Sequence, residues 1–275
     1  MPEGPEIRRA ADTIEKQISG RIIDRIYFGQ PPLKRWESVL TGLKIKHITT
    51  HGKAMVMHLE EDLHIYSHNQ LYGRWRCCKS NKYPATNRSL RIAIDCQERS
   101  ALLYSASDIA VLDKEGLKQH PFLSKIGPDV LDESVTSAQI VERLRSKRFC
   151  NRQLRSVLLD QSFVAGIGNY LRCETLFYCG LDPRVRSRDL SDDDVEHLAE
   201  TILDMAWQSY YTEGITNDLE VANSLMEQGA KFGDVRHYVY NRRGKPCYYC
   251  DTTIRKTQGS GQAIHYCPVC QSADL

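Results

Sequence analysis

The sequence predicts an α+β protein with an N-terminal helix, an antiparallel β-sandwich domain and a helical domain that ends in a cysteine-rich hairpin. Residues 5–19 have apolar side chains at helical spacing, and the segments from there to residue 106 alternate apolar with polar residues. Beyond residue 131 helical spacing returns. At 275 residues the chain is long enough for more than one core. We therefore expect domains at residues 1–131, 132–235 and 236–275.

The first predicted domain combines one amphipathic helix with many short strands. Gly20 follows the helical pattern of residues 5–19 as a stop signal. Seven segments then read as half-buried strands, because strands expose alternate side chains to opposite faces. They are residues 21–28, 43–50, 54–59, 63–68, 74–78, 89–96 and 101–106. Short strands separated by turn signals favour a sandwich or a barrel.

The second predicted domain is a small helical bundle. Thr136 with Gln139 is typical of a capping box that opens a helix through Arg145, and Ser191 with Asp194 opens a longer helix to about Tyr211. Two apolar-periodic segments, 152–161 and 168–180, are joined by a tight turn at 162–168. Residues 214–229 have no clear period, so we expect a long functional loop there.

Four of the ten cysteines are regularly spaced. Cys247 and Cys250 form one Cys-x-x-Cys pair, and Cys267 and Cys270 form a second pair after sixteen intervening residues. Two such pairs offer four thiolates to one tetrahedral Zn²⁺, and the intervening residues would form a hairpin. A pair of disulfides is the alternative. The other six cysteines are scattered, as reduced thiols of a cytosolic protein are.

The charge is concentrated in two stretches although the net charge is only +2. Residues 143–155 carry six positive residues and no acid, and residues 231–256 carry seven positives against Asp234 and Asp251. Such stretches suit a polyanion such as nucleic acid, or are solvated helix faces. The sequence has no apolar run of eighteen residues and no signal-peptide pattern, so we expect a soluble protein that is not exported and does not contact a membrane.

The first residues, MPEGPE, are unusually stiff for a terminus. If Met1 is removed, Pro2 becomes a secondary amine, and an α-amino group titrates near a pKa of about 8, so part of it is nucleophilic at neutral pH. Attack of this amine on a sugar C1′ would give a cationic iminium, which accepts electrons in elimination reactions. Glu3 would transfer a proton, and Glu6 would orient the terminus. Simple stiffening by Pro2 is the alternative.

The motifs MPEGPEIRRA, HGKAM, YSHNQLYG and LDQSFVAGIGNYLR, together with the four-cysteine hairpin, resemble the formamidopyrimidine-DNA glycosylase and endonuclease VIII family of base-excision repair enzymes. The motifs follow the family's order from Pro2 to Cys270. Gly4 and the segment from Gln70 to Tyr72 resemble the bacterial endonuclease VIII branch. The resemblance implies a monomeric cytoplasmic enzyme of the bacterial nucleoid, a helix-two-turns-helix element, one structural Zn²⁺ and duplex DNA with oxidised bases or abasic sites as substrate.

The resemblance also assigns roles to individual residues. Pro2 would be the nucleophile that forms a Schiff base with the deoxyribose, and Glu3 would be its acid-base partner. Lys53 and Asn169 would contact phosphates beside the lesion. Asn169 lies in a glycine-rich turn, which would allow a phosphate to come close. Because removal of a base from the duplex costs roughly a few kcal/mol of stacking and pairing, a group must fill the hole. The residues that match the family's void-filling triad are Gln70, Leu71 and Tyr72.

One position departs from the family pattern. Gln262 stands in the hairpin where the family usually has an arginine that binds phosphates, and glutamine lacks the permanent charge and the bidentate fork. The leading interpretation is a glycosylase and abasic-site lyase for oxidised pyrimidines that acts by β,δ-elimination. The alternatives are an enzyme for oxidised purines, a damaged-DNA binder with weakened catalysis, and a zinc-ribbon protein of transcription or translation.

Overall fold

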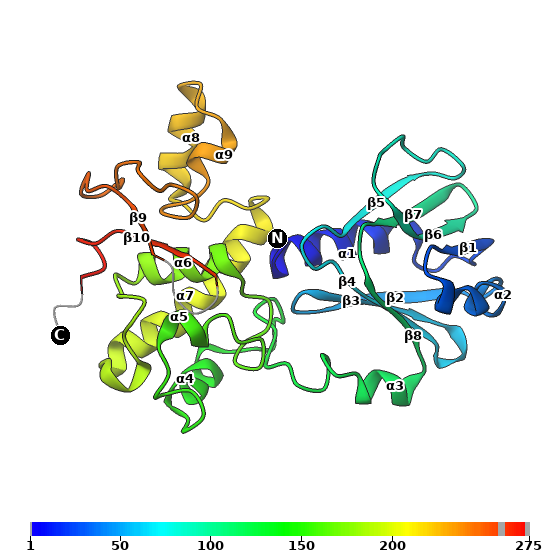
Figure 1. Ribbon diagram of the computed structural model, residues 1–275, viewed down its shortest axis with the longest axis horizontal. Helices are drawn as coiled ribbons and strands as arrows, with labels where there is room; N and C mark the ends of the chain where they lie inside the picture. The colour runs from blue at the N-terminus through cyan, green and yellow to red at the C-terminus, as the bar shows by residue number, and fades with distance from the viewer. Residues whose placement is uncertain (1, 258–261, 273–275) are drawn as a thin grey trace. The chain divides into compact units, whose positions relative to one another are not determined.

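The computed structural model describes residues 2–257 and 262–272, which form two compact units (Figure 1). The first unit contains Pro2 and residues 6–125, and the second contains residues 3–5 and 126–272. The chain therefore leaves the first unit at the Pro2–Glu3 peptide bond and returns to it at Glu6. Pro2 and Glu3, the first two candidate site residues of the sequence, therefore belong to different units.

Helix α1, Gly4–Ile18, confirms the predicted N-terminal helix. Its apolar stripe of Ile7, Ala11, Ile14 and Ile18 is buried in the core of the first unit. The charged residues between them lie on the outer face, and Arg8 pairs there with Asp12 at 2.9 Å. Burial of one face explains why the 3.6-residue period was visible in the sequence.

Two four-stranded antiparallel sheets make up the rest of the first unit, in the orders β1-β6-β7-β5 and β2-β3-β4-β8. The strands are β1 Arg25–Phe28, β2 Ile45–His51, β3 Ala54–Leu59, β4 His64–His68, β5 Arg74–Lys79, β6 Leu90–Cys96, β7 Arg99–Tyr104 and β8 Asp108–Leu112. One core takes side chains from both sheets, for example Phe28 and Leu103 from the first and Met57 and Ile65 from the second. The predicted sandwich is confirmed.

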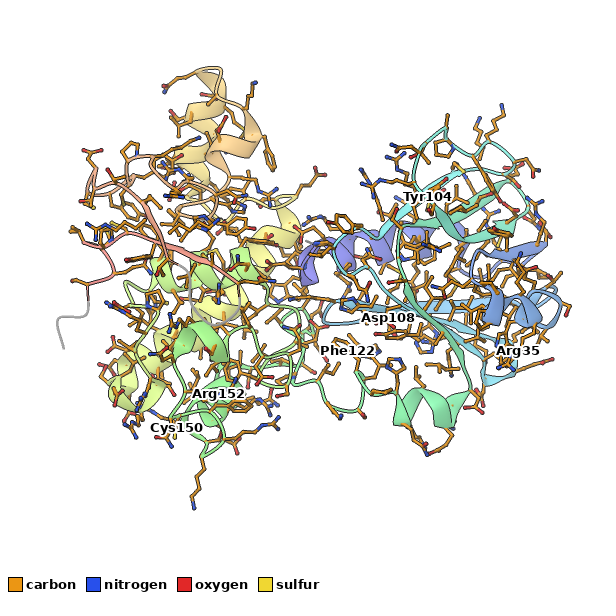
Figure 2. The ribbon with its side chains drawn as sticks, in the orientation of Figure 1. Arg35, Tyr104, Asp108, Phe122, Cys150 and Arg152 are labelled. Atoms are coloured by element: carbon orange, nitrogen blue, oxygen red, sulfur yellow. The ribbon has the colours of Figure 1, made fainter. Side chains whose placement is uncertain are left out.

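Several short elements of the first unit were not predicted. Strand β8 begins at Asp108, which Figure 2 labels. The strand is half-buried along its whole length and so gives no alternating pattern. The short helices carry too few residues to show a period. They are η1 Pro31–Trp36, α2 Glu37–Leu40, η2 Glu60–Asp62 and α3 Lys114–Gln119.

The second unit is helical. Its elements are α4 Ser137–Arg145, α5 Leu154–Val157, α6 Asn169–Tyr178, η3 Ser187–Asp189, α7 Asp192–Tyr211, α8 Leu219–Glu227 and α9 Phe232–Val235. Thr136 and Gln139 form the predicted capping box, because each side chain bonds the other's backbone amide. Ser191 caps α7 by accepting from the amide of Asp194 at 3.1 Å. Both predicted helix starts are confirmed.

The expectation of a long loop at residues 214–229 is wrong, because helix α8 lies within it. Asp218 caps the helix by accepting from the amide of Val221 at 3.0 Å. The apolar face of α8 is narrow, and Ala222 packs in a small cluster with Ile215 and Val235. A small cluster of this kind needs few apolar residues, which explains the weak period in the sequence.

The predicted hairpin between the cysteine pairs is present as strands β9, Arg255–Thr257, and β10, Ile264–Tyr266, which pair antiparallel. Cys247 and Cys267 are buried in the core of the second unit. Among the helices within residues 2–257 and 262–272, none combines the length and apolar character needed to cross a membrane.

Candidate active site

In the first unit, Pro2 lines a cavity of about 340 Å³. The other lining residues come from α1, from the loop between β4 and β5, from the start of β5 and from the loop before β6. They are Glu6, Ala10, Asn69, Leu71, Tyr72, Gly73, Arg74, Trp75 and Arg88. Glu6 also pairs with Arg9 at 3.3 Å, one turn along α1. The cavity brings the candidate nucleophile together with two members of the predicted void-filling triad.

The loop of residues 69–73 turns sharply and presents large side chains to solvent. The amide of Gly73 donates to the carbonyl of Asn69 at 2.7 Å, and a Cβ on Gly73 would lie 2.5 Å from that carbonyl oxygen, so only glycine fits. Leu71 and Tyr72 are 58% and 70% exposed. Exposed apolar side chains beside a cavity commonly mark a binding surface.

Lys53 lies in the tight turn between β2 and β3. Gly52 before it has φ of 60°, a conformation that favours glycine. The Lys53 side chain is only 7% exposed, which distinguishes it from an ordinary solvated turn lysine. Lys53, Pro2 and the 69–73 loop all belong to the first unit.

In the second unit, Glu3 is bound at the N-terminus of α6. Its carboxylate accepts from the amides of Gly168 at 2.7 Å, Tyr170 at 2.8 Å and Leu171 at 3.3 Å, and the residue is 2% exposed. The first amides of a helix have no partner within the helix and attract negative charge. The amide of Gly4 also donates to the carbonyl of Gly166 at 2.8 Å.

The two glycines of the turn before α6 allow close packing, and Gly168 leaves the space that Glu3 occupies. A Cβ on Gly168 would lie 2.3 Å from Cδ of Glu3, so any side chain there would displace the carboxylate. Gly166 has φ of 104°, and a Cβ there would lie 2.7 Å from Val130. The glycines that the sequence analysis assigned to a close approach of phosphate also permit the close approach of Glu3.

Asn169, the first residue of α6, joins this turn to the cysteine hairpin. Its amide group donates to the carbonyl of Ala263 at 3.0 Å. Arg172, one turn further on, donates to the carbonyl of Gln262 at 3.0 Å, to that of Arg155 at 2.8 Å, and to Asn169 Oδ1. Arg172 is buried, and burial lowers its pKa. Gln262 itself is exposed beside the turn.

Sequence reasoning missed both Arg172 and Glu174. Glu174 is fully buried and accepts from the amides of Val239 and Tyr240 at 2.9 and 2.8 Å, from the amide of Tyr238, and from the Thr216 hydroxyl at 2.8 Å. Burial raises the pKa of Glu174, and the amides of Val239, Tyr240 and Tyr238 oppose that shift. The signal in the sequence was that Arg172 and Glu174 are the two charged residues in a helix whose other residues are apolar or uncharged.

The four spaced cysteines fit a tetrahedral metal ion. Their sulfur atoms all lie within 4.8 Å of one another, and close pairs are 3.5 Å apart for Cys250 and Cys267 and 3.8 Å for Cys247 and Cys270. A disulfide needs about 2.05 Å, whereas four thiolates about 2.3 Å from one ion are about 3.8 Å apart. All four cysteines are free, so the disulfide alternative is wrong.

Comparisons with known proteins agree with this geometry. Residues 1–107 match the formamidopyrimidine-DNA glycosylase N-terminal domain, and residues 126–219 match the formamidopyrimidine-DNA glycosylase H2TH domain. Endonuclease 8 of Shigella sonnei and Endonuclease 8 of Escherichia coli K12 are each 44% identical over 98% of this chain and 100% of their own. The chain belongs to the formamidopyrimidine-DNA glycosylase and endonuclease VIII family. Its members are DNA glycosylases with abasic-site lyase activity.

Solved structures of the family share the fold. Lactococcus lactis formamidopyrimidine-DNA glycosylase non-covalently bound to DNA with an abasic site is 22% identical, with a TM-score of 0.80 over 98% of this chain and 99% of that one. The same enzyme with DNA containing an oxidised pyrimidine is 23% identical, with a TM-score of 0.80 over 98% and 100% of the two chains. At this identity the likeness establishes the α+β fold.

The basic stretch at residues 143–155 is largely engaged in contacts inside the second unit of this family member. Arg143 donates to the carbonyl of Phe163 at 2.6 Å, Arg145 to that of Ser187 at 2.5 Å, and Arg152 pairs with Asp160 at 2.7 Å. Figure 2 labels Arg152, which follows α4. These bonds stabilise the turn and the helix ends, and Lys147 and Arg148 in the same stretch are exposed.

Proposed function

We propose that this protein is a bifunctional DNA glycosylase and abasic-site lyase that removes oxidised pyrimidines from duplex DNA. The observation that carries the proposal is the position of Pro2, which lines a cavity with the exposed Leu71 and Tyr72. The identity of 44% to Endonuclease 8 supports the pyrimidine branch. The partner is double-stranded DNA, and the enzyme acts as a monomer in the bacterial cytoplasm.

Pro2 supplies the nucleophile once Met1 is removed. Its secondary amine attacks C1′ of the damaged nucleotide, the bond from C1′ to the base breaks, and the base leaves with a proton. Opening of the sugar ring then gives an iminium between Pro2 and C1′. Because the amine is secondary, this iminium is positively charged without protonation of its nitrogen. Loss of a C2′ proton then expels the 3′ phosphate, and a second elimination expels the 5′ phosphate. The product is a one-nucleotide gap bounded by phosphates.

Glu3 transfers the protons that these steps require. The ring oxygen of the sugar must be protonated as the ring opens, and Glu3 is the residue bonded directly to Pro2 in the chain. Three amides at the start of α6 fix its carboxylate, which prevents loss of orientation. Glu6 belongs to the cavity and orients the terminus.

Lys53, Asn169 and Gln262 contact the phosphates beside the lesion. Lys53 provides a buried positive charge in the first unit. Asn169 at the start of α6 and Gln262 in the hairpin are joined through the carbonyl of Ala263 and through Arg172 in the second unit. Gln70, Leu71 and Tyr72 fill the space that the extracted base leaves.

Cys247, Cys250, Cys267 and Cys270 hold one structural Zn²⁺. Four thiolates complete a tetrahedron and leave no position for a catalytic water. With the ion bound, the four cysteines would fix the two ends of the hairpin on which Gln262 lies. The role of the ion would be structural, and the reaction at C1′ would be carried out by Pro2 and Glu3.

A lesion panel tests the proposal. Duplex oligonucleotides with dihydrouracil, thymine glycol, 8-oxoguanine or an abasic site are incubated with the wild type and with Pro2→Gly and Glu3→Ala. We expect cleavage of the pyrimidine lesions and of the abasic site by the wild type, and strong loss in both variants. Preference for 8-oxoguanine would instead establish an oxidised-purine enzyme.

A damaged-DNA binder with weakened catalysis is the second candidate, and Gln262 is the observation that favours it. Compared with the arginine that the family usually has at this position, glutamine cannot make a bidentate, charge-assisted hydrogen bond to a phosphate. Tight binding to abasic-site DNA with no cleavage of any lesion in the panel would support the binder and refute the enzyme.

A further inference from the structure

The loop of residues 69–73 is held from two sides by side chains outside it. The hydroxyl of Ser107 donates to Oε1 of Gln70 at 2.7 Å, and Nη1 of Arg88 donates to the carbonyl of Tyr72 at 2.8 Å. Ser107 precedes β8, and Arg88 precedes β6. The first and last residues of the predicted triad are therefore anchored by residues from two different loops.

The loop needs such anchors because its own conformation is unfavourable. Gln70 has φ of 50°, in the left-handed region that costs a residue with a side chain free energy. Leu71 and Tyr72 are mostly exposed, so burial does not hold them in place. The amide of Gln70 donates to Nδ1 of His68 at 3.0 Å, which fixes the start of the loop but not the tip.

Arg88 also faces the cavity that Pro2 lines. It is an exposed residue in an irregular segment, where an arginine would ordinarily be solvated. Its bond to the main-chain carbonyl of Tyr72 holds the backbone of the loop beside that cavity, independently of the side chain at residue 72. Ser107 acts in the same way on Gln70, through a side-chain bond.

We propose that Arg88 and Ser107 are positioning residues that hold Gln70, Leu71 and Tyr72 in the shape that enters the duplex. This inference rests on the proposed function. A preformed wedge reduces the ordering that must occur when the base leaves the stack. Its loss slows extraction of a damaged base and has little effect on an abasic site, from which no base must be removed.

The test compares a damaged base with a preformed abasic site in Arg88→Met, Ser107→Ala and the double variant. Single-turnover excision of dihydrouracil should fall about tenfold in each single variant, which corresponds to one lost hydrogen bond. Borohydride trapping on abasic-site DNA should fall much less than excision in the same variants, so the ratio of excision rate to trapping rate should decrease severalfold. Arg88→Lys, which can still donate to a carbonyl, should restore most of the excision rate.

Two further variants serve as matched controls. Arg99→Met changes an arginine at the far end of β7 from Tyr104, and Ser89→Ala changes an exposed serine next to Arg88. Both should behave as the wild type. The fluorescence of 2-aminopurine next to the lesion measures entry of the wedge directly, and its rise on binding should be slower in Arg88→Met and Ser107→Ala.

Equal loss of excision and of abasic-site trapping would overturn the inference, because it would indicate a general effect on folding or binding. Wild-type excision and wild-type fluorescence in the double variant would overturn it as well. A wild-type protein that neither excises nor traps would refute the proposed function. The 2-aminopurine signal would still decide the positioning role in that case, because it needs binding but no chemistry.

Discussion

Replacement of Gly168 by alanine should disable the enzyme by displacing Glu3. The backbone of Gly168, at φ −126° and ψ −151°, is open to any residue, so the change introduces no backbone strain. The added Cβ would, however, lie 2.3 Å from Cδ and 2.4 Å from Oε1 of Glu3. Ordinary contact requires more than 3.4 Å, so the carboxylate must move by about 1 Å or more.

The displacement breaks the bonds from the amides of Gly168 and Tyr170, which are 2.7 and 2.8 Å long. Hydrogen bonds to a charged group contribute about 1.5–3 kcal/mol each, and water can replace part of that at the opened helix end, so we expect a loss of about 3 kcal/mol in the free energy of unfolding. A misplacement of about 1 Å also costs roughly a hundredfold in rate.

Urea unfolding and single-turnover trapping on abasic-site DNA measure the two effects. Gly233→Ala is the matched control, because a Cβ at Gly233 meets no atom within 4 Å. It should leave the trapping rate at the wild-type value and should not lower the urea midpoint, because alanine in a helix is at least as stable as glycine. If Gly168→Ala unfolds at the wild-type midpoint and traps at the wild-type rate, the reasoning about Glu3 and the start of α6 is refuted.

Three further predictions concern the metal, the hairpin and pH. Metal analysis should find about one zinc per chain, and Cys250→Ser or a strong chelator should abolish DNA binding; undiminished binding by the metal-free protein would contradict the structural role. Gln262→Arg should tighten binding to abasic-site DNA and steepen the slope of log K against log salt by about one, whereas an unchanged affinity and slope would count against a phosphate contact at this position. Burial, and then the neighbouring His47, lowers the pKa of His58 to about 4, below the usual 6.5, so its contribution to stability is complete above pH 6.5 and is lost as the pH falls toward 4. The urea midpoint should therefore fall less between pH 6.5 and 4.5 in His58→Gln than in the wild type, and equal falls would show that His58 does not contribute.

The sequence was informative wherever a residue's neighbours in the chain determine its structure. The stripe of Ile7, Ala11, Ile14 and Ile18 predicted α1, and the capping box at Thr136 predicted the start of α4. The cysteine spacing predicted the hairpin because the chain between the two pairs must turn back if all four sulfur atoms are to meet at one metal site.

Features that depend on distant neighbours were not predictable in this way. Strand β8 is half-buried throughout because Ile109 and Val111 pack on one apolar cluster and Ala110 and Leu112 on another, and so it lacks alternation. Helix α8 was taken for a loop because its few apolar contacts come from residues before and after it. Arg172 donates to the carbonyl of Gln262, and Glu174 accepts from the amide of Val239. Both partners are more than sixty residues away in the chain, so no local sequence pattern indicates them.

The proposed mechanism depends most directly on the identity of the atom that attacks C1′. Borohydride reduction of the enzyme on abasic-site DNA, followed by proteolysis and mass spectrometry of the cross-linked peptide, identifies that atom. We expect the reduced sugar remnant to be attached to the nitrogen of Pro2 in a peptide that lacks Met1. An adduct on a lysine such as Lys53, or covalent trapping by protein that retains Met1, would contradict it.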